Sequence, residues 1–159
     1  MGSCLPDGVY VTGAEFIKSQ LALRAWRDAF SEGLDGMRAV CHVFRNRANA
    51  GWWNGDWIQI LSHHKDASSR VEPDSDTLPD PRVYSFQCLL QEIDGIFSGA
   101  AKDDVTVPVL PTFTAGVYRP VLYYARLDQI TNDWFLENIS RKTAEHPRLA
   151  QVGQIFFFA

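Results

Sequence analysis

The chain has 159 residues, of which 46% are hydrophobic and 21% charged, so one domain with one sizeable core is expected. The net charge of −4 gives no electrostatic reason to expect nucleic acid or an anionic membrane surface as a partner. The cysteines Cys4, Cys41 and Cys88 have no disulfide-framework spacing, and Cys41 and Cys88 fall inside apolar helical patterns.

The first helices are predicted from apolar residues that recur at three- and four-residue steps. Thr12 and Glu15 have the spacing of a capping box, which predicts a helix from residue 13 or 14 to about residue 30. Gly33 interrupts this pattern, and a second helix is expected over residues 35–50. Its apolar face carries Met37, Val40, Cys41 and Phe44, and its opposite face carries Arg38, Arg45 and Arg47.

The rest of the chain alternates short predicted elements with polar loops. These are, in order, a turn at Asn54 and Gly55, a helix over 56–64, a loop over 65–81, a helix over 82–97 that stops at Gly99, a loop or short edge strand over 100–120, a strand over 121–127, a helix from 131 or 132 to 142, and a buried strand or extended tail over 151–159. The expected fold is therefore mainly α (α+β), a single domain with a small β element, preceded by an extension over residues 1–12.

The N-terminal sequence MGSCLPDG has no charged segment followed by an apolar run, and no run reaches transmembrane length. We expect cytoplasmic synthesis without a signal peptide and without membrane insertion. Action outside the cell would then need a carrier.

Asp28 and Glu32 lie one helical turn apart, where the first apolar pattern ends. On one helix the two charges would repel by about 0.2–0.5 kcal/mol, and a helix C-terminus disfavours anions. Gly33 and Asp35 leave a second placement open, in which Glu32 lies near the start of the next helix. The pair is either solvated at a helix junction or a candidate acid catalyst.

An ordered set of residues resembles SleB-like cell-wall hydrolases over nearly the whole chain. The segment from Asp28 to Glu32 takes the place of the family's Glu-Ala-x-Gly-Glu signature. The remaining matches are Gly36, Ala39, Val40, Asn46, Arg47, Gly51, Trp52, Trp53, Tyr123, Tyr124, Asp133, Trp134, Val152, Gly153 and Phe157.

This resemblance implies a lysozyme-like or lytic-transglycosylase-like domain over residues 13–159 that cleaves peptidoglycan glycan strands. A single carboxyl group would act as acid and then as base, and the sugar's own hydroxyl would attack to give an anhydro product, with no metal or cofactor. Such an acid must stay protonated near neutral pH, and Trp26 and Phe30 could flank its pocket. By this resemblance Asp28 and Glu32 are the catalytic candidates. The substrate-binding candidates are Asn46, Arg47, Ser68, Ser69, Tyr123 and Tyr124.

The family pattern is broken at four places around the expected cleft. Asp28 stands where the family has its catalytic Glu, so the carboxyl reaches one methylene less far. The others are Lys65 to Ser69, Pro120-Val121 and the residues after Gly153, where Ile155 follows Gln154 and the family's His is missing.

Two functions therefore remain open. One is cleavage of glycan strands. The alternative is a catalytically inactive SleB-like domain used as a structural or binding component, in a phage or prophage particle. A virion or a holin-type partner would carry either form to the cell wall.

Several further residues have competing interpretations. His63, His64 and Asp66 lack metal-site spacing, and residues 75–77 lack the Gly and distal Glu of a calcium loop. Trp52 and Trp53 could stack on sugar rings or pack in the core. An Arg47 ion pair with Asp28 or Glu32 would lower the pKa of that acid and argue against acid catalysis.

Overall fold

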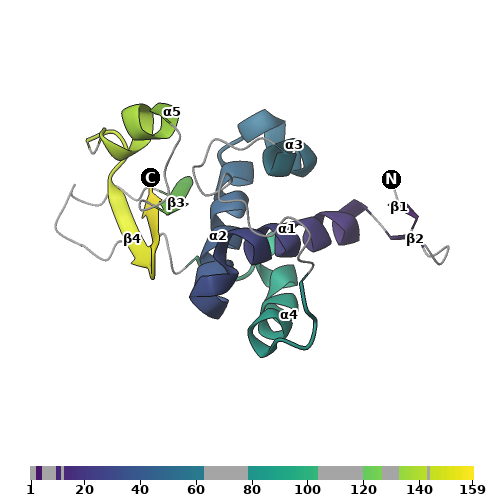
Figure 1. The fold of residues 1–159 in the computed structure, drawn as a ribbon. Coiled ribbons are helices and arrows are strands. Elements are labelled where there is room, and N and C mark those ends of the chain that lie inside the picture. Colours follow the sequence, from purple (N-terminus) through teal and green to yellow (C-terminus); the bar gives the residue numbers. More distant parts are fainter. Residues whose placement is uncertain are drawn as a thin grey trace.

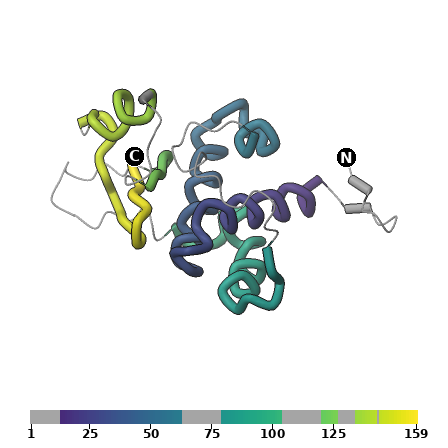
Figure 2. The backbone as a smooth tube through the Cα atoms, in the orientation of Figure 1, coloured from purple at the N-terminus to yellow at the C-terminus, as the bar shows by residue number. Residues whose placement is uncertain are grey.

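The computed structural model describes residues 3–4, 10–11, 13–62, 79–103, 120–126, 133–142 and 144–159. The described chain is mainly helical with a small antiparallel sheet (Figure 1). This confirms the fold class expected from the sequence. The backbone trace in Figure 2 places the sheet and its short helix on one side and the longer helices beside them.

Three long helices form the body of the protein. They are α1 (Gly13–Ala29), α2 (Gly33–Asn49) and α4 (Tyr84–Ser98), and α3 (Trp57–Ser62) is a shorter helix beside them. Helix α2 is central and packs against both α1 and α4 (Figure 1). Each helix begins or ends within about two residues of its predicted boundary, which is the usual uncertainty for helix ends.

The apolar stripes of these helices meet in one core. Leu21, Met37, Val40, Phe44 and Leu89 are fully buried in it. Burying one such side chain stabilises the fold by about 1.5–3 kcal/mol. Cys41 lies in the same core, and burial raises the pKa of its thiol well above the usual range, so it cannot serve as a nucleophile near neutral pH.

The sheet has the strand order β3-β5-β4, formed by β3 (Tyr123–Arg126), β4 (Arg148–Val152) and β5 (Ile155–Phe158). All neighbouring strands are antiparallel, and Tyr124 is opposite Phe157. Side chains alternate across the sheet. Tyr124, Ile155 and Phe157 therefore join the helical core, whereas Ala125 and Phe158 join a second cluster with Phe135 and Ile139.

The helical residues of the second cluster are Phe135, from helix α5 (Asp133–Phe135), and Ile139, from the π-helical turn that continues it (Leu136–Ser140). Because both faces of β5 are covered, its sequence IFFF is apolar throughout and has no alternation. The sequence predicts a buried strand or extended tail over residues 151–159. The structure instead forms a hairpin whose first strand starts at Arg148.

A second small sheet precedes α1, where β1 (Ser3–Cys4) pairs antiparallel with β2 (Tyr10–Val11). The sequence predicts only an extension there. Thr12, the expected N-cap of α1, lies outside the described residues, as do Thr131 and Asn132 before α5.

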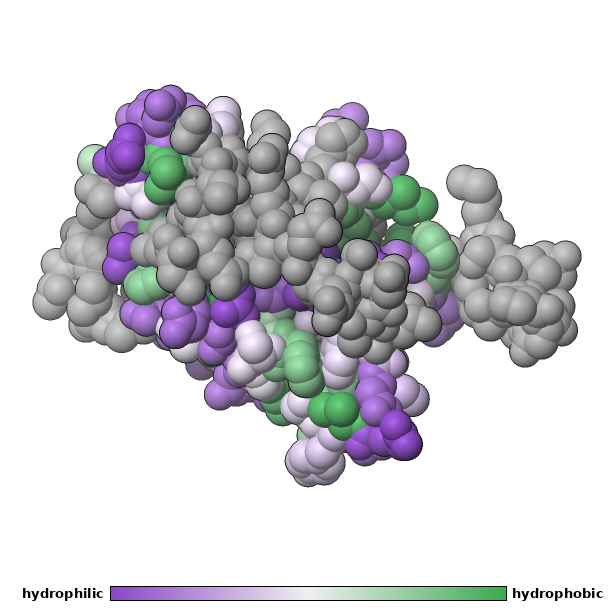
Figure 3. All heavy atoms as spheres, viewed as in Figure 1, coloured by the Kyte–Doolittle hydropathy of each residue, from purple (hydrophilic) through white to green (hydrophobic). Residues whose placement is uncertain are grey.

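The described residues on the face shown in Figure 3 are a mixture of hydrophilic and hydrophobic types. The large exposed hydrophobic side chains come from several separate elements: Phe30, Ile58, Tyr84, Leu90 and Trp134. Scattered side chains of this kind are normal for a folded surface. None of the helices in the described ranges is both long and apolar enough to cross a bilayer.

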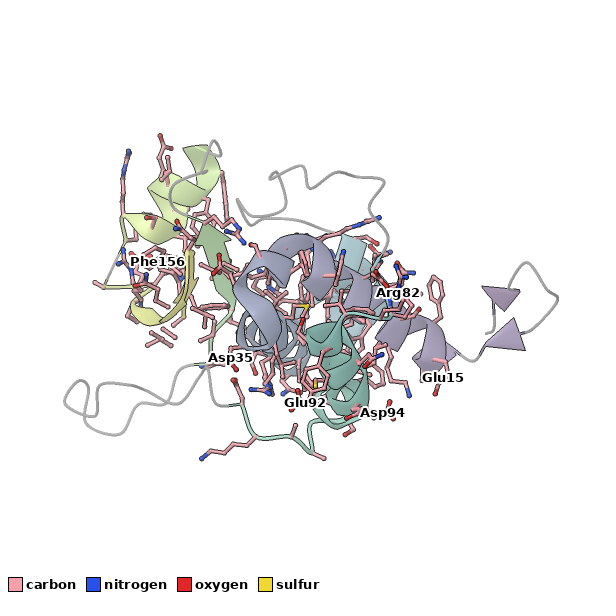
Figure 4. The ribbon with its side chains drawn as sticks, turned by 60° about the horizontal axis from the view of Figure 1, so that its bottom comes forward. Glu15, Asp35, Arg82, Glu92, Asp94 and Phe156 are labelled. Atoms are coloured by element: carbon pink, nitrogen blue, oxygen red, sulfur yellow. The ribbon has the colours of Figure 1, made fainter. Side chains whose placement is uncertain are left out.

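Charged side chains join α4 to the other two long helices at the surface. Lys18 Nζ lies 2.8 Å from Glu15 and 2.7 Å from Asp94, and Arg38 contacts both Asp35 and Glu92. Figure 4 shows these four acids around the helical body, with Phe156 on the sheet. Exposed pairs of this kind contribute about 0–1 kcal/mol each, so the core carries most of the stability.

We predict that Gly99→Ala destabilises the protein by about 1–2 kcal/mol. Gly99 ends α4 with φ +83°, and an added Cβ would lie 2.9 Å from the Arg45 guanidinium, which donates to Phe97 O at 2.7 Å. Urea denaturation measures the change.

Gly95→Ala is the matched control for this prediction. Gly95 lies inside α4, and its Cβ would have Ala101 Cβ as nearest neighbour at 3.4 Å. Alanine is favoured over glycine in a helix interior by roughly 0.5–1 kcal/mol, so this variant should be at least as stable as the native protein. Equal losses in both variants would contradict the role given to Gly99.

Candidate functional site

The two candidate acids lie on either side of the elbow between α1 and α2. Asp28 is in the last turn of α1, a 3-10 turn follows over Phe30–Glu32, and Glu32 directly precedes α2. Glu32 is therefore near a helix N-terminus, where an anion is favoured. Of the two placements left open by the sequence, the structure adopts this second one.

The Asp28 carboxylate is buried, with 6% of the residue exposed. Its Oδ2 accepts a hydrogen bond from Arg24 Nε at 2.7 Å and another from the Tyr124 hydroxyl. Arg24 comes from the preceding turn of α1 and Tyr124 from β3. Both contacts stabilise the charged carboxylate over the neutral acid.

Glu32 is bound to the same strand by a second ion pair. Arg126 Nη1 donates to Glu32 Oε1 at 2.9 Å, and Arg126 Nη2 donates to Ser31 Oγ. The side chains of both ion-paired residues are largely sheltered from solvent. β3 therefore contacts the carboxylate on each side of the elbow.

Two glycines leave room for Glu32. A Cβ on Gly153, in the turn between β4 and β5, would lie 1.7 Å from Glu32 Oε2. A Cβ on Gly36, in the first turns of α2, would lie 2.6 Å from Glu32 Cβ. The close approach of the turn and the helix to this side chain therefore depends on glycine at both positions.

Asn46 and Arg47 hold the segment that leads into β3. Asn46 Nδ2 donates to Val121 O at 3.1 Å and to Asp103 Oδ2 at 2.8 Å, and Arg47 Nε donates to Leu122 O at 2.7 Å. Arg47 is only 1% exposed, although it lies on the face of the second helix opposite the predicted apolar residues. The cations that pair with Asp28 and Glu32 are Arg24 and Arg126.

Four aromatic rings surround the Arg47 guanidinium. Its Cζ lies 4.8 Å from the centroid of Trp52 and 5.0 Å from that of Phe44, and the rings of Tyr123 and Tyr124 are within 6 Å. Cation–π contacts and the bond to Leu122 O satisfy a charge that would otherwise be costly to bury. Arg47 therefore connects α2, the turn after it and β3.

The tryptophans considered as sugar platforms pack within the protein. Trp52 and Trp53 are partly buried against the core, and Trp52 lies 5.5 Å from Tyr123 between ring centroids. This geometry favours the core interpretation. Trp26 is buried and stacks on Phe30 at 4.1 Å, and Phe30 stays half exposed at the elbow.

Some predicted site residues lie outside the described residues. These are Ser68, Ser69, His63, His64, Asp66 and residues 75–77. In the part of the chain that is described, no group of His, Cys, Asp and Glu side chains has the geometry of a metal site.

Two cavities lie along another face of α2. One of about 460 Å³ is lined by Arg38, His42, Glu92 and Lys102 among others, and one of about 400 Å³ by His42, Arg45, Asn46 and Asp103 among others. Both have mixed charge. Asp28 and Glu32 line neither of them, so these cavities do not present the two acids to a ligand.

Sequence reasoning missed Arg24 and Arg126, and it placed Gly153 in a C-terminal motif without connecting it to Glu32. Arg24 is four residues before Asp28, a spacing that brings side chains together on a helix, so the sequence held that signal. Arg126 and Gly153 are far from Glu32 along the chain, and no local pattern connects them.

No protein-family model, curated protein or solved structure matches this chain.

We predict that Gly153→Ala destabilises the protein by about 2–4 kcal/mol, because it displaces Glu32 and places alanine at φ +55°. Thermal unfolding monitored by circular dichroism measures the loss.

Gly153→Ala combined with Glu32→Ala separates the two causes. Removing the Glu32 side chain relieves the collision, so the double variant should lose less than the sum of the single losses. Strictly additive losses would show that Glu32 does not occupy the space beside Gly153.

Proposed function

We propose that this chain is a SleB-like domain directed at peptidoglycan glycan strands, in which the carboxylate at the position of the family's acid no longer cleaves the strand. The observation that carries the proposal is the double contact of Asp28 with Arg24 and Tyr124 in a buried position. The domain would act as a structural or binding component, with a virion or a holin-type partner bringing it to the cell wall.

A general acid for glycan cleavage must hold a proton near neutral pH and release it to the leaving oxygen. Enzymes achieve this by placing the carboxyl group in an apolar pocket away from cations. Asp28 is in a buried place, but Arg24 Nε is 2.7 Å away and favours loss of the proton. Its Oδ2 also accepts from Tyr124, and its side chain is one methylene shorter than glutamate. All three features oppose acid catalysis.

Glu32 supports a second candidate, cleavage of the glycan strand. Its side chain is 13% exposed, against 5% for Asp28, and it lies beside the exposed residues Phe30 and Ser31. Its ion pair with Arg126 opposes this role for the same reason as above. We therefore place cleavage second.

The test is digestion of purified peptidoglycan with product analysis by mass spectrometry, together with co-sedimentation of the protein with intact sacculi. We expect the native protein to sediment with sacculi and to release no anhydro-muropeptides. Asp35→Asn is the matched control, because Asp35 is an exposed acid of α2 with 79% of its side chain exposed.

Release of anhydro-muropeptides by the native protein, lost in Asp28→Asn or in Glu32→Gln but kept in Asp35→Asn, would establish cleavage and identify the acid. If the native protein neither binds sacculi nor cleaves glycan strands, that result would contradict any role at peptidoglycan. Activity that appears only in Asp28→Glu would support the proposed loss of the acid.

A further inference from the structure

The Arg24–Asp28 pair is sheltered from solvent. The side chain of Arg24 is 13% exposed and that of Asp28 is 5% exposed, and Nε and Oδ2 are 2.7 Å apart. The Arg24 guanidinium also lies 5.6 Å from the centroid of the Phe44 ring. Water screens such a pair much less than a surface pair, so the effect of Arg24 on the charge of Asp28 is large.

Each packed element contributes different groups around Asp28. Tyr124 comes from β3 and donates its hydroxyl to Oδ2. Arg47 comes from α2, but its Nε is bonded to Leu122 O and its guanidinium lies among aromatic rings. One turn further along the chain, Glu32 is paired with Arg126.

Helix α4 carries two acids on the described residues that face other partners. Glu92 is paired with Arg38, and Asp94 is paired with Lys18. The remaining neighbours along α1 are Ala25, Trp26 and Ala29, which are buried and uncharged, and Arg27, which is exposed. The cation that pairs with Asp28 is Arg24, from the preceding turn of α1.

We propose that Arg24 is the positioning residue that keeps Asp28 ionised. Arg24 thereby prevents Asp28 from holding the proton that a general acid needs. Without the guanidinium, burial favours the neutral carboxyl group over the charged carboxylate. This inference rests on the proposed function and names the residue that removes the acid.

The experiment is a carboxyl-carbon NMR titration of Asp28 in the native protein and in Arg24→Met, with the Asp28 signal assigned by its loss in Asp28→Asn. We expect native Asp28 to titrate below the ordinary value of about 3.9. In Arg24→Met it should titrate about one to three pH units higher than in the native protein. Arg24→Lys, which keeps a cation, should shift less than Arg24→Met.

Arg38→Met is the matched control, because Arg38 is an arginine of α2 that pairs with Asp35 and Glu92. It should leave the titration of Asp28 unchanged. Two results would overturn the inference: native Asp28 titrating at or above the ordinary value, or equal titrations in the native protein and in Arg24→Met. The first result is measured on the native protein, so it tests the inference even if Arg24→Met does not fold.

The pH dependence of stability gives an independent readout. An ionised, paired Asp28 stabilises the fold above the pKa of the unfolded chain, and this contribution is lost as the pH falls. The unfolding free energy of the native protein minus that of Arg24→Met should therefore grow between about pH 3 and pH 6. A difference that stays constant over this range would also contradict the inference.

These outcomes are separate from the test of the proposed function. Glycan cleavage by the native protein would overturn the proposed function whatever Asp28 does on titration. An unchanged titration in Arg24→Met, with no cleavage by the native protein, would overturn only the role of Arg24.

Discussion

The arrangement of this protein depends on one buried contact, in which Asp28 at the end of α1 binds both Arg24 of its own helix and Tyr124 of β3. The contact determines where the sheet meets the helical body. Tyr124 belongs to the helical core through one face of the sheet, and the other face of β3 and β5 packs on α5. A shift of β3 by one residue would turn Tyr124 toward α5 and leave the charge of Asp28 with one partner fewer.

Further polar contacts hold β3 in the same place. Asn46 and Arg47 bind the backbone of residues 121 and 122, and Arg126 binds Glu32. Some of these contacts are made by side chains of α2 and others by side chains of β3. Such a connected set of satisfied polar groups specifies one docking geometry, whereas apolar packing alone tolerates several.

This arrangement also explains how an elbow with two carboxylates can be stable. Two acids one turn apart would repel on a continuous helix. The 3-10 turn over Phe30–Glu32 separates Asp28, in α1, from Glu32, which directly precedes α2, and each acid is paired with a different arginine. Charge neutralised in this way contributes to structure and is unavailable for proton transfer, which is the physical basis for the proposed loss of cleavage.

The helices and their apolar faces could be predicted from sequence because these signals are local. Met37, Val40 and Phe44 recur at helical steps, and all three are buried. The strand β4 could not be found in this way, since its sequence RLAQV does not alternate strictly between polar and apolar residues. Arg47 illustrates the limit for the site: its position opposite the apolar face of the second helix gives no sign of burial, but Tyr123 and Tyr124 of the distant strand β3 lie within 6 Å of its guanidinium. The pairings of Glu32 with Arg126 and Gly153 are likewise set by tertiary contacts.

A double-mutant cycle between Asp28 and Tyr124 tests this account most directly. Unfolding free energies of the native protein, Asp28→Ala, Tyr124→Phe and the double variant give the coupling between the carboxylate and the hydroxyl. A buried hydrogen bond to a charged group predicts a coupling of about 1–3 kcal/mol. A coupling below about 0.5 kcal/mol, within the usual range for independent sites, would show that the contact does not hold the sheet to the helices.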